Sequence, residues 1–170
     1  METKKTISIH YSSADLVESY NRAVDLVAKE RKYLSTIEGF SLESSRDFLS
    51  YVIQYNFAQY FLISGKTVIG WCDVIPKSIP EFSHVGVLGM GILPEYRGKG
   101  YGKKLMDKTI KHAFTINNLE KIELIVYESN EGAISLYRKA GFIEEGKRMQ
   151  VRKIDGRYEN ELFMGMFRPA

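Results

Sequence analysis

The chain has 170 residues, of which 44% are apolar and 26% charged, and its formal net charge is +3. This length is enough for one domain with a complete apolar core, and the composition excludes a disordered or fibrous chain. The single Cys72 excludes an internal disulfide, and three scattered histidines exclude a structural zinc cluster, so we expect no metal. Residues 1–5 begin no signal-like apolar run and no segment is long enough to span a bilayer, so we expect a cytoplasmic protein without a membrane partner.

The first half of the chain predicts a strand, two helices and a hairpin. Residues 6–11 alternate apolar and polar side chains, as a half-buried strand does. Ser12 or Ser13 offers a cap for a helix that runs toward Arg31, and Ser41 offers a cap for the second helix. The two hairpin strands follow at 57–64 and 67–75, with a turn between them.

The second half of the chain predicts further strands and helices around a glycine-rich turn. A loop at 76–80 comes first. In chain order the elements are a strand at 82–93, a helix after the turn at 97–102, a strand at 121–127, a helix from Asn130, and strands at 142–154 and 158–166. Asp155-Gly156 joins the last two strands and is typical of a tight hairpin. The sequence thus predicts one mixed sheet with helices on both faces.

The turn Arg97-Gly98-Lys99-Gly100-Tyr101-Gly102 has the strand–turn–helix context of an anion site. The first amides of a helix lack internal partners and lie at the positive end of its dipole. Glycines leave no Cβ to hold a phosphate away from the backbone. Residues 97–111 contain six bases and one acid, a balance of +5 in a chain whose total is +3. The turn therefore predicts a ligand that carries phosphate.

The sequence motifs of two common phosphate-binding loops do not match this turn. A Walker loop needs a glycine where Arg97 stands and a hydroxyl where Lys104 stands. The dinucleotide fingerprint needs a third glycine where Lys103 or Leu105 stands. The turn fits the motif [QR]-x-x-G-x-[GA] instead, and this motif resembles the coenzyme A pyrophosphate loop of the GNAT family of N-acetyltransferases.

A second motif lies downstream, after the strand predicted at 121–127. Residues 130–142 read N-E-G-A-I-S-L-Y-R-K-A-G-F and match the family's N-x-x-A-x-x-L-Y-x-x-x-G-F at every specified position. Two motifs in the right order make the chain similar to this family over about residues 60–167. Within it, the runs at 70–73 and 88–91 resemble the phosphinothricin-acetyltransferase-like bacterial branch.

The resemblance implies an α/β (α+β) fold in a single domain over residues 1–170. Its sheet is mixed and mostly antiparallel, twisted, of about seven strands, and splayed at the central parallel pair by a bulge that Gly86, Gly89 and Gly91 would allow. The three sections of the domain are an acceptor side at 6–56, the sheet core with the pyrophosphate loop at 57–118, and a catalytic half with the final hairpin at 119–167.

The resemblance also implies an enzyme that transfers an acetyl group from acetyl-CoA to a primary amine by direct attack in a ternary complex. The acceptor stays open between a small molecule, such as an amino acid or analogue, and a protein or peptide amine; a homodimer also stays open. One alternative is an acyl-CoA-binding regulatory module with impaired catalysis, because Ile125 stands where some relatives carry glutamate. Nucleic-acid contact by the basic helix is a second alternative, but we expect no nucleic-acid partner.

The expected coenzyme contacts come from the long strand, the turn and the second motif. Strand backbone would pair with the pantetheine arm, turn amides would hold the diphosphate, and lysines would reach the 3′-phosphate. The residues are Met90, Gly91, Ile92, Arg97, Gly98, Lys99, Gly100, Tyr101, Gly102, Lys103 and Asn130. A glycine-rich strand packed tightly on a helix, and a helix cap made by Asn130, are the structural alternatives.

Tyr137 takes the family's role of general acid to the coenzyme sulfur, because a phenol pKa near 10 keeps it protonated at neutral pH. Aromatic packing is the alternative. For the general base we expect Glu123, which shares a strand face with Ile125 and lies one bridging water away from its place. Asp73, His84 and an ordered water relay stay open as bases.

The acceptor pocket is expected from the first two helices, their connection and the final hairpin. Its candidates offer carboxylates and aromatic faces suited to a cation, and they fit an ordinary amphipathic surface equally well. They are Glu30, Tyr33, Trp71, Asp73 and Tyr158. Cys72 is expected to pack rather than to act as a nucleophile, because the sequence names no neighbour that would activate its thiol.

Overall fold

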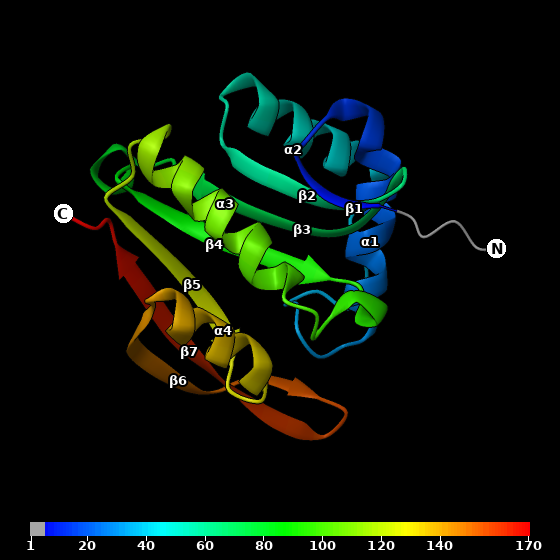
Figure 1. Ribbon diagram of the computed structural model, residues 1–170. Helices are drawn as coiled ribbons and strands as arrows, with labels where there is room; N and C mark the ends of the chain where they lie inside the picture. Colours follow the sequence, from blue (N-terminus) through cyan, green and yellow to red (C-terminus); the bar gives the residue numbers. More distant parts are fainter. Residues whose placement is uncertain (1–5) are drawn as a thin grey trace.

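The computed structural model describes residues 6–170, which form one sheet with helices on both faces (Figure 1). The expectation drawn from residues 1–5 lies outside this range. The helices are α1 (Val17–Lys29), α2 (Leu42–Gln54), α3 (Tyr101–Thr115) and α4 (Glu131–Ala140). The strands are β1 (Ile7–Tyr11), β2 (Ala58–Ser64), β3 (Thr67–Pro76), β4 (Val85–Ile92), β5 (Lys121–Tyr127), β6 (Ile143–Ile154) and β7 (Arg157–Phe167).

The seven strands lie in the order β1-β2-β3-β4-β5-β7-β6, and β4 and β5 form the parallel pair among antiparallel neighbours. Successive side chains of a strand point to opposite faces, and the core is divided accordingly. Leu49 and Trp71 belong to the core under α1 and α2, whereas Leu105 and Ile134 belong to the core under α3 and α4. The expected mixed sheet, covered on both faces, is confirmed.

The parallel strands β4 and β5 stay together over a short stretch only. Their pairing runs from Val85 with Lys121 to Val87 with Glu123. Both strands continue beyond this point, and Figure 1 shows them diverging toward the start of α3. The splay that the resemblance implies is therefore present. The expected bulge in β4 is not seen against β3, because that register is unbroken from Gly86 to Ile92.

Two glycines of β4 serve close packing inside the protein. A Cβ on Gly86 would meet the side chains of Leu119 and Val74, and a Cβ on Gly91 would overlap the Trp71 ring. The tight packing of the structural alternative is thus present, but the groups that these glycines meet lie on β3 and before β5, not on a helix. The backbone groups of β4 beyond Val87 are left to face the gap, since pairing with β5 ends there.

Several element ends differ from the sequence prediction. A 3-10 turn at Ala14–Leu16 precedes α1, so the Ser13 side chain makes no capping hydrogen bond and the Ser12/Ser13 cap is wrong. Ser41 does cap α2, with its oxygen accepting from the Ser44 amide at 3.1 Å. A second 3-10 turn at Pro80–Phe82 delays the start of β4 to Val85.

The final hairpin turns where the sequence predicts. Asp155 and Gly156 both have positive φ, at 50° and 77°, which is what a tight two-residue turn requires. Its tip reaches the connection between α1 and α2, where Arg31 pairs with Asp155 at 2.9 Å and the Arg152 guanidinium donates to the Arg31 carbonyl at 2.8 Å. The first and last sections of the chain therefore meet beside the splayed strands.

Candidate active site

The glycine turn presents a row of unpaired amides at the N-terminus of α3. Gly98 and Gly100 adopt left-handed φ values of 71° and 80°, and a Cβ at either position would meet nothing within 4 Å. Within the described part of the chain, the amides of residues 98–103 donate to no protein acceptor. Together with the helix dipole, they form a cradle suited to a diphosphate.

The lysines of the turn are partly engaged by the protein itself. Lys99 donates to the Glu95 carbonyl at 2.6 Å, and Lys103 pairs with Asp107 one turn along α3 at 2.5 Å. Lys104 is exposed beside them. Both ion-pair partners lie at the surface, where such a pair contributes about 0.2–1 kcal/mol, so an arriving phosphate competes with weak contacts.

Arg97 anchors the turn to the end of α1. Its Nε donates to the Ile92 carbonyl at 2.7 Å, and its two terminal nitrogens donate to both Glu30 oxygens at 2.8 and 2.5 Å. The guanidinium also lies 4.8 Å from the Tyr33 ring centre. Hydrogen bonding to Glu30 raises the pKa of Arg97. Two residues expected in different sites, Arg97 for coenzyme and Glu30 for acceptor, are in fact one bidentate pair.

Gly102 faces the protein rather than the open cradle. A Cβ there would lie 3.4 Å from Leu136 and 3.8 Å from Met90, and the residue lies in the first turn of α3 with no left-handed φ. A larger side chain at Gly102 would therefore press on α4. Tyr101, the first residue of α3, is partly exposed next to it.

Tyr137 lies buried in α4 on the α3 side of the sheet, with its ring 5.8 Å from that of Phe142. Burial, with a contribution from nearby Cys72, raises the pKa of the Tyr137 phenol above its usual value. Among residues 6–170 its hydroxyl makes no hydrogen bond. The group thus keeps its proton at neutral pH and has that proton free to donate.

Cys72 is buried in the same region, and burial raises the pKa of its thiol. A thiol in this state is not a nucleophile at neutral pH, which agrees with the expected packing role. Asn130 caps α4, because its side-chain oxygen accepts from the Ala133 amide at 3.2 Å. The capping alternative is therefore correct for the oxygen, and the amide nitrogen of the same side chain is left for a ligand.

Glu123 is held by two cations. Its carboxylate lies 2.5 Å from Lys77 and 3.9 Å from Lys121. The predicted shared face with Ile125 is correct, since both residues alternate with the buried Ile122 and Leu124. Ile125 itself is 54% exposed, so the place of the missing glutamate is open to solvent.

Asp73 and His84 differ strongly in their placement. His84 is exposed before the first residue of β4, at the strand end remote from the glycine turn. Asp73 lies in the middle of β3 opposite Gly89. Burial raises the pKa of Asp73 to about 7. Asp73 is therefore an expected base whose pKa is moved toward neutral pH by burial.

The expected acceptor residues are only partly brought together. Trp71 is 5% exposed, packed edge-on against Tyr20 with ring centres 6.1 Å apart, so it supports the site from beneath. Tyr158 lies exposed near the hairpin tip, with Lys153 5.0 Å above its ring. Tyr33 covers Arg97 at the end of α1.

Two residues that sequence reasoning missed lie beside Asp73. Gln59 is fully buried in β2 directly opposite Asp73, and Tyr20 reaches the same place from α1. The signal for Gln59 was present, because it is the one amide in the run Ala58 to Ile63 that is otherwise apolar or aromatic. A buried amide in such a strand needs a polar partner.

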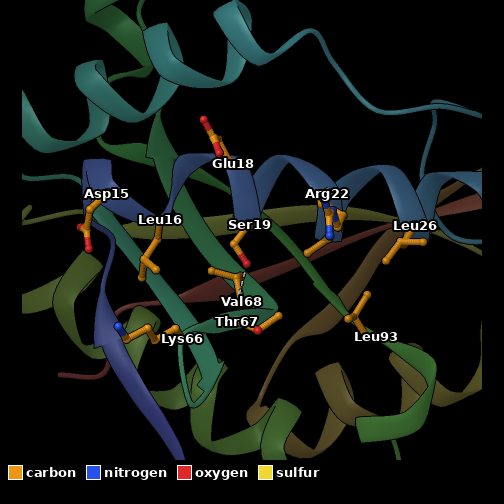
Figure 2. A pocket seen from close by; sticks show the side chains of 11 residues that line it. Asp15, Leu16, Glu18, Ser19, Arg22, Leu26, Lys66, Thr67, Val68 and Leu93 are labelled. Atoms are coloured by element: carbon orange, nitrogen blue, oxygen red, sulfur yellow. Dashed lines mark hydrogen bonds between the residues drawn. The ribbon is translucent and has the colours of Figure 1, made fainter.

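A cavity of about 340 Å³ lies elsewhere, between α1 and the β2–β3 turn. Figure 2 shows its wall, with Asp15 and Arg22 from the N-terminal turn and α1, Lys66 from the β2–β3 turn, and Leu93 after β4. Acidic and basic side chains are both present around it. It is separate from the amide cradle and from Asp73, and it contains none of the expected site residues.

No cluster of three or more potential metal-binding side chains occurs among residues 6–170. In the same range, no helix combines the length and the apolar character that a membrane span needs.

Comparison with known proteins agrees with this geometry. Residues 23–142 match the family model described as the Acetyltransferase (GNAT) family. The chain is 43% identical over 76 residues to spermidine N(1)-acetyltransferase of Escherichia coli K12, a match that covers 45% of this chain and 41% of that protein. It is 28% identical over 97 residues to the L-amino acid N-acetyltransferase AaaT of the same strain, covering 57% and 60%. The chain thus spans less than half the length of the spermidine relatives that it matches.

Solved structures share the whole fold at low identity. An acetyltransferase of the GNAT family from Streptococcus pneumoniae has a TM-score of 0.89 at 22% identity, covering 95% of this chain and 99% of that one. A GNAT superfamily phosphinothricin acetyltransferase from Sinorhizobium meliloti, in complex with AcCoA, has a TM-score of 0.88 at 16% identity, covering 95% and 88%. The expected phosphinothricin-acetyltransferase-like proteins are therefore among its structural neighbours, as a likeness of fold. With a family model over most of its length and the matching fold, the chain belongs to the acetyltransferase (GNAT) family.

Proposed function

We propose that this protein is an N-acetyltransferase that moves an acetyl group from acetyl-CoA to a primary amine by direct attack in a ternary complex. The observation that carries the proposal is the row of unpaired amides at residues 98–103, next to strands that separate beyond Val87. A diphosphate fits the amides, and an extended thioester arm fits the gap with its edge of free strand backbone. Acetyl-CoA supplies the activated acyl group.

The chain's own residues have three tasks in this reaction. Amides of the turn bind the diphosphate, and backbone groups of Met90 and Ile92 align the arm along β4. A base takes a proton from the ammonium group, so that the nitrogen lone pair forms a bond to the carbonyl carbon while the carbon–sulfur bond breaks. The Tyr137 hydroxyl gives its proton to the departing thiolate, and the acylated nitrogen releases its second proton, which restores the Tyr137 phenol. The buried Cys72 thiol is not needed as an acyl carrier.

The acceptor is proposed as a small amine, with polyamines and amino acids as the first classes to test, because relatives named for spermidine and for L-amino acids match this chain. The matched segments cover under two thirds of those proteins, so the acceptor has to be established for this chain itself. We propose no nucleic-acid partner, since the basic helix presents its free amides to the splay.

A thiol-release assay on a panel of polyamines, L-amino acids, aminoglycosides and short peptides tests the proposal. Turnover that depends on both acetyl-CoA and an amine supports it. Tight coenzyme binding by calorimetry with no turnover on the whole panel would favour the regulatory module. An absence of coenzyme binding, with salt-dependent binding to DNA or RNA, would point to the nucleic-acid alternative.

A further inference from the structure

The Asp73 carboxylate lies over the point where β4 leaves β5. Asp73 pairs across the sheet with Gly89, and a Cβ placed on Gly89 would be 3.3 Å from the Asp73 Oδ1 atom. Gly89 comes two positions after Val87, the last residue that β4 pairs with β5. The missing side chain of Gly89 therefore leaves the carboxylate directly above the beginning of the splay.

Asp73 also lies on the sheet face opposite α3, the helix whose N-terminus forms the diphosphate cradle. It alternates with Cys72 and Val74, which belong to the core under α3 and α4, and it is approached by Tyr20 from α1. An amine that enters from the α1 side would meet Asp73, while the thioester arm enters beside α3. Direct transfer between two substrates needs this opposed arrangement of acceptor and donor.

The surroundings of Asp73 are polar and incomplete. Gln59 is fully buried opposite Asp73, beside both that carboxylate and the Tyr20 hydroxyl. Neither its amide oxygen nor its amide nitrogen completes a hydrogen bond within the described residues. A buried amide without partners is costly, and its position is explained if it completes its bonds with Asp73 and a bound substrate.

The charges around Asp73 set it apart from the other acids near the splay. Glu30 is paired with Arg97, Glu123 with Lys77, and Glu161 with Arg148. Asp73 is faced by Tyr20 from α1, Gln59 from β2, Cys72 on its own strand and the bare backbone of Gly89 from β4, with no cation among them. Burial without a cation accounts for a carboxyl group that titrates near neutral pH.

We infer that Asp73 is the base that removes the proton from the attacking amine, and that Gln59 and Tyr20 are positioning residues for its carboxylate. The inference rests on the proposed acetyl transfer. The ammonium proton moves to an Asp73 oxygen, the freed lone pair forms the carbon–nitrogen bond, and the proton then leaves to solvent, since Asp73 is partly exposed. The Tyr20 ring is itself fixed, stacked on Phe61 with centres 5.0 Å apart.

The first test needs no substrate. The infrared carbonyl band of a protonated carboxyl group, taken as the difference between the parent and Asp73→Asn, is followed from pH 4 to pH 9 with the full chain. We expect a band that disappears with a midpoint near pH 7. A midpoint near pH 4, or no difference band, would overturn the assignment whether or not any acceptor is known.

The second test uses the pH dependence of turnover with the best amine of a spermidine, L-amino acid and peptide panel. We expect Asp73→Asn to lower kcat by about 10²-fold or more and to leave acetyl-CoA affinity unchanged. The variant should also lose the acidic limb of the pH–rate profile, which is the fall in kcat as the pH is lowered. Asp47→Asn, an exposed acid of α2, is the matched control and should keep the parent profile. An Asp73→Asn profile equal to the parent, or loss of the acidic limb in Glu123→Gln instead, would overturn the inference.

The positioning role has its own readout. Gln59→Met keeps the volume and removes the amide, so we expect the acidic limb to move while acetyl-CoA affinity stays the same. If Gln59→Met only lowers the melting temperature and leaves the acidic limb of the pH–rate profile in place, Gln59 has a packing role and no positioning role. If the parent turns over no amine of the panel yet the infrared midpoint lies near pH 7, the transferase proposal fails separately from the titration of Asp73.

Discussion

The Tyr137 side chain is buried, and its hydroxyl keeps its proton and makes no hydrogen bond within residues 6–170. If it protonates the leaving thiolate, its contribution appears in the transition state and not in coenzyme binding. We expect Tyr137→Phe to lower kcat by about 10²-fold with little change in the KM for acetyl-CoA. Steady-state kinetics measure both constants. Parent-like turnover would leave only the edge-on packing against Phe142 as its role.

Gly100, like Gly98, has a left-handed backbone that favours glycine, and the space beside it is open. Its φ is 80°, and a side chain would project into open space beside the free amides. Gly100→Val should therefore weaken coenzyme A binding at least tenfold, about 1.4 kcal/mol. Gly156→Val is the control, because Gly156 has a φ of 77° and equally open surroundings at the hairpin tip. Equal coenzyme affinity in both variants would remove the cradle from the site.

At the scale of elements, the Arg97–Glu30 pair joins the turn before α3 to the end of α1. Both Glu30 oxygens accept from Arg97, so each residue has the other as its partner. If the pair acts as an anchor, Arg97→Gln and Glu30→Gln should each weaken coenzyme A binding and lower the melting temperature. The double variant should lose no more than either single change, with a coupling of about 0.5–3 kcal/mol.

Calorimetry and thermal melting of the four proteins complete this cycle. A large loss of affinity in Arg97→Gln, with none in Glu30→Gln, would place the guanidinium on the coenzyme itself, as the motif alone suggests.

The elements were predictable where local chemistry decides them. Asp155-Gly156 demands positive φ, and Ser41 supplies a cap oxygen, so turn and helix start could be foreseen. The cap at Ser13 failed because a 3-10 turn, set by tertiary packing, intervenes. The cradle could be predicted from its glycines. The pairing of Arg97 with Glu30, far apart in sequence, and the burial of Gln59 against Asp73 depend on strand order and register, which no local pattern contains.

At the scale of the whole molecule, the sheet separates the two halves of the proposed reaction. The cradle and Tyr137 belong with α3 and α4, whereas Asp73, Gln59 and Tyr20 lie on the side of α1. The two faces of the sheet are connected at the splay between β4 and β5, because hydrogen bonding between these strands ends at Val87 and Glu123. A carboxyl group buried at this opening without a cation has a cost, because it lowers the free energy of unfolding. We attribute its presence to the proposed acetyl transfer.

That cost predicts how stability changes with pH. Burial raises the pKa of Asp73 from 3.8 to about 7 in the folded protein. Between these values the unfolded chain has released the proton that the folded protein still holds, so the free energy of unfolding falls as the pH rises. About three units at 1.36 kcal/mol each give a loss on the order of 4 kcal/mol, complete above pH 7 and absent below about pH 4.

Asp73→Asn has no such proton and should escape this loss. We expect it to melt roughly 8–16 °C above the parent at pH 8, since 1 kcal/mol corresponds to about 2–4 °C in a chain of this size. At pH 3 the two proteins should melt together, because the Asp73 carboxyl is then mostly neutral in both folded and unfolded states. Other titrating groups, such as Asp25, are common to both proteins and cancel in the difference. A melting difference that is the same at both pH values would mean that folding does not raise the pKa of Asp73, and burial would then not prepare this carboxyl to exchange a proton near neutral pH.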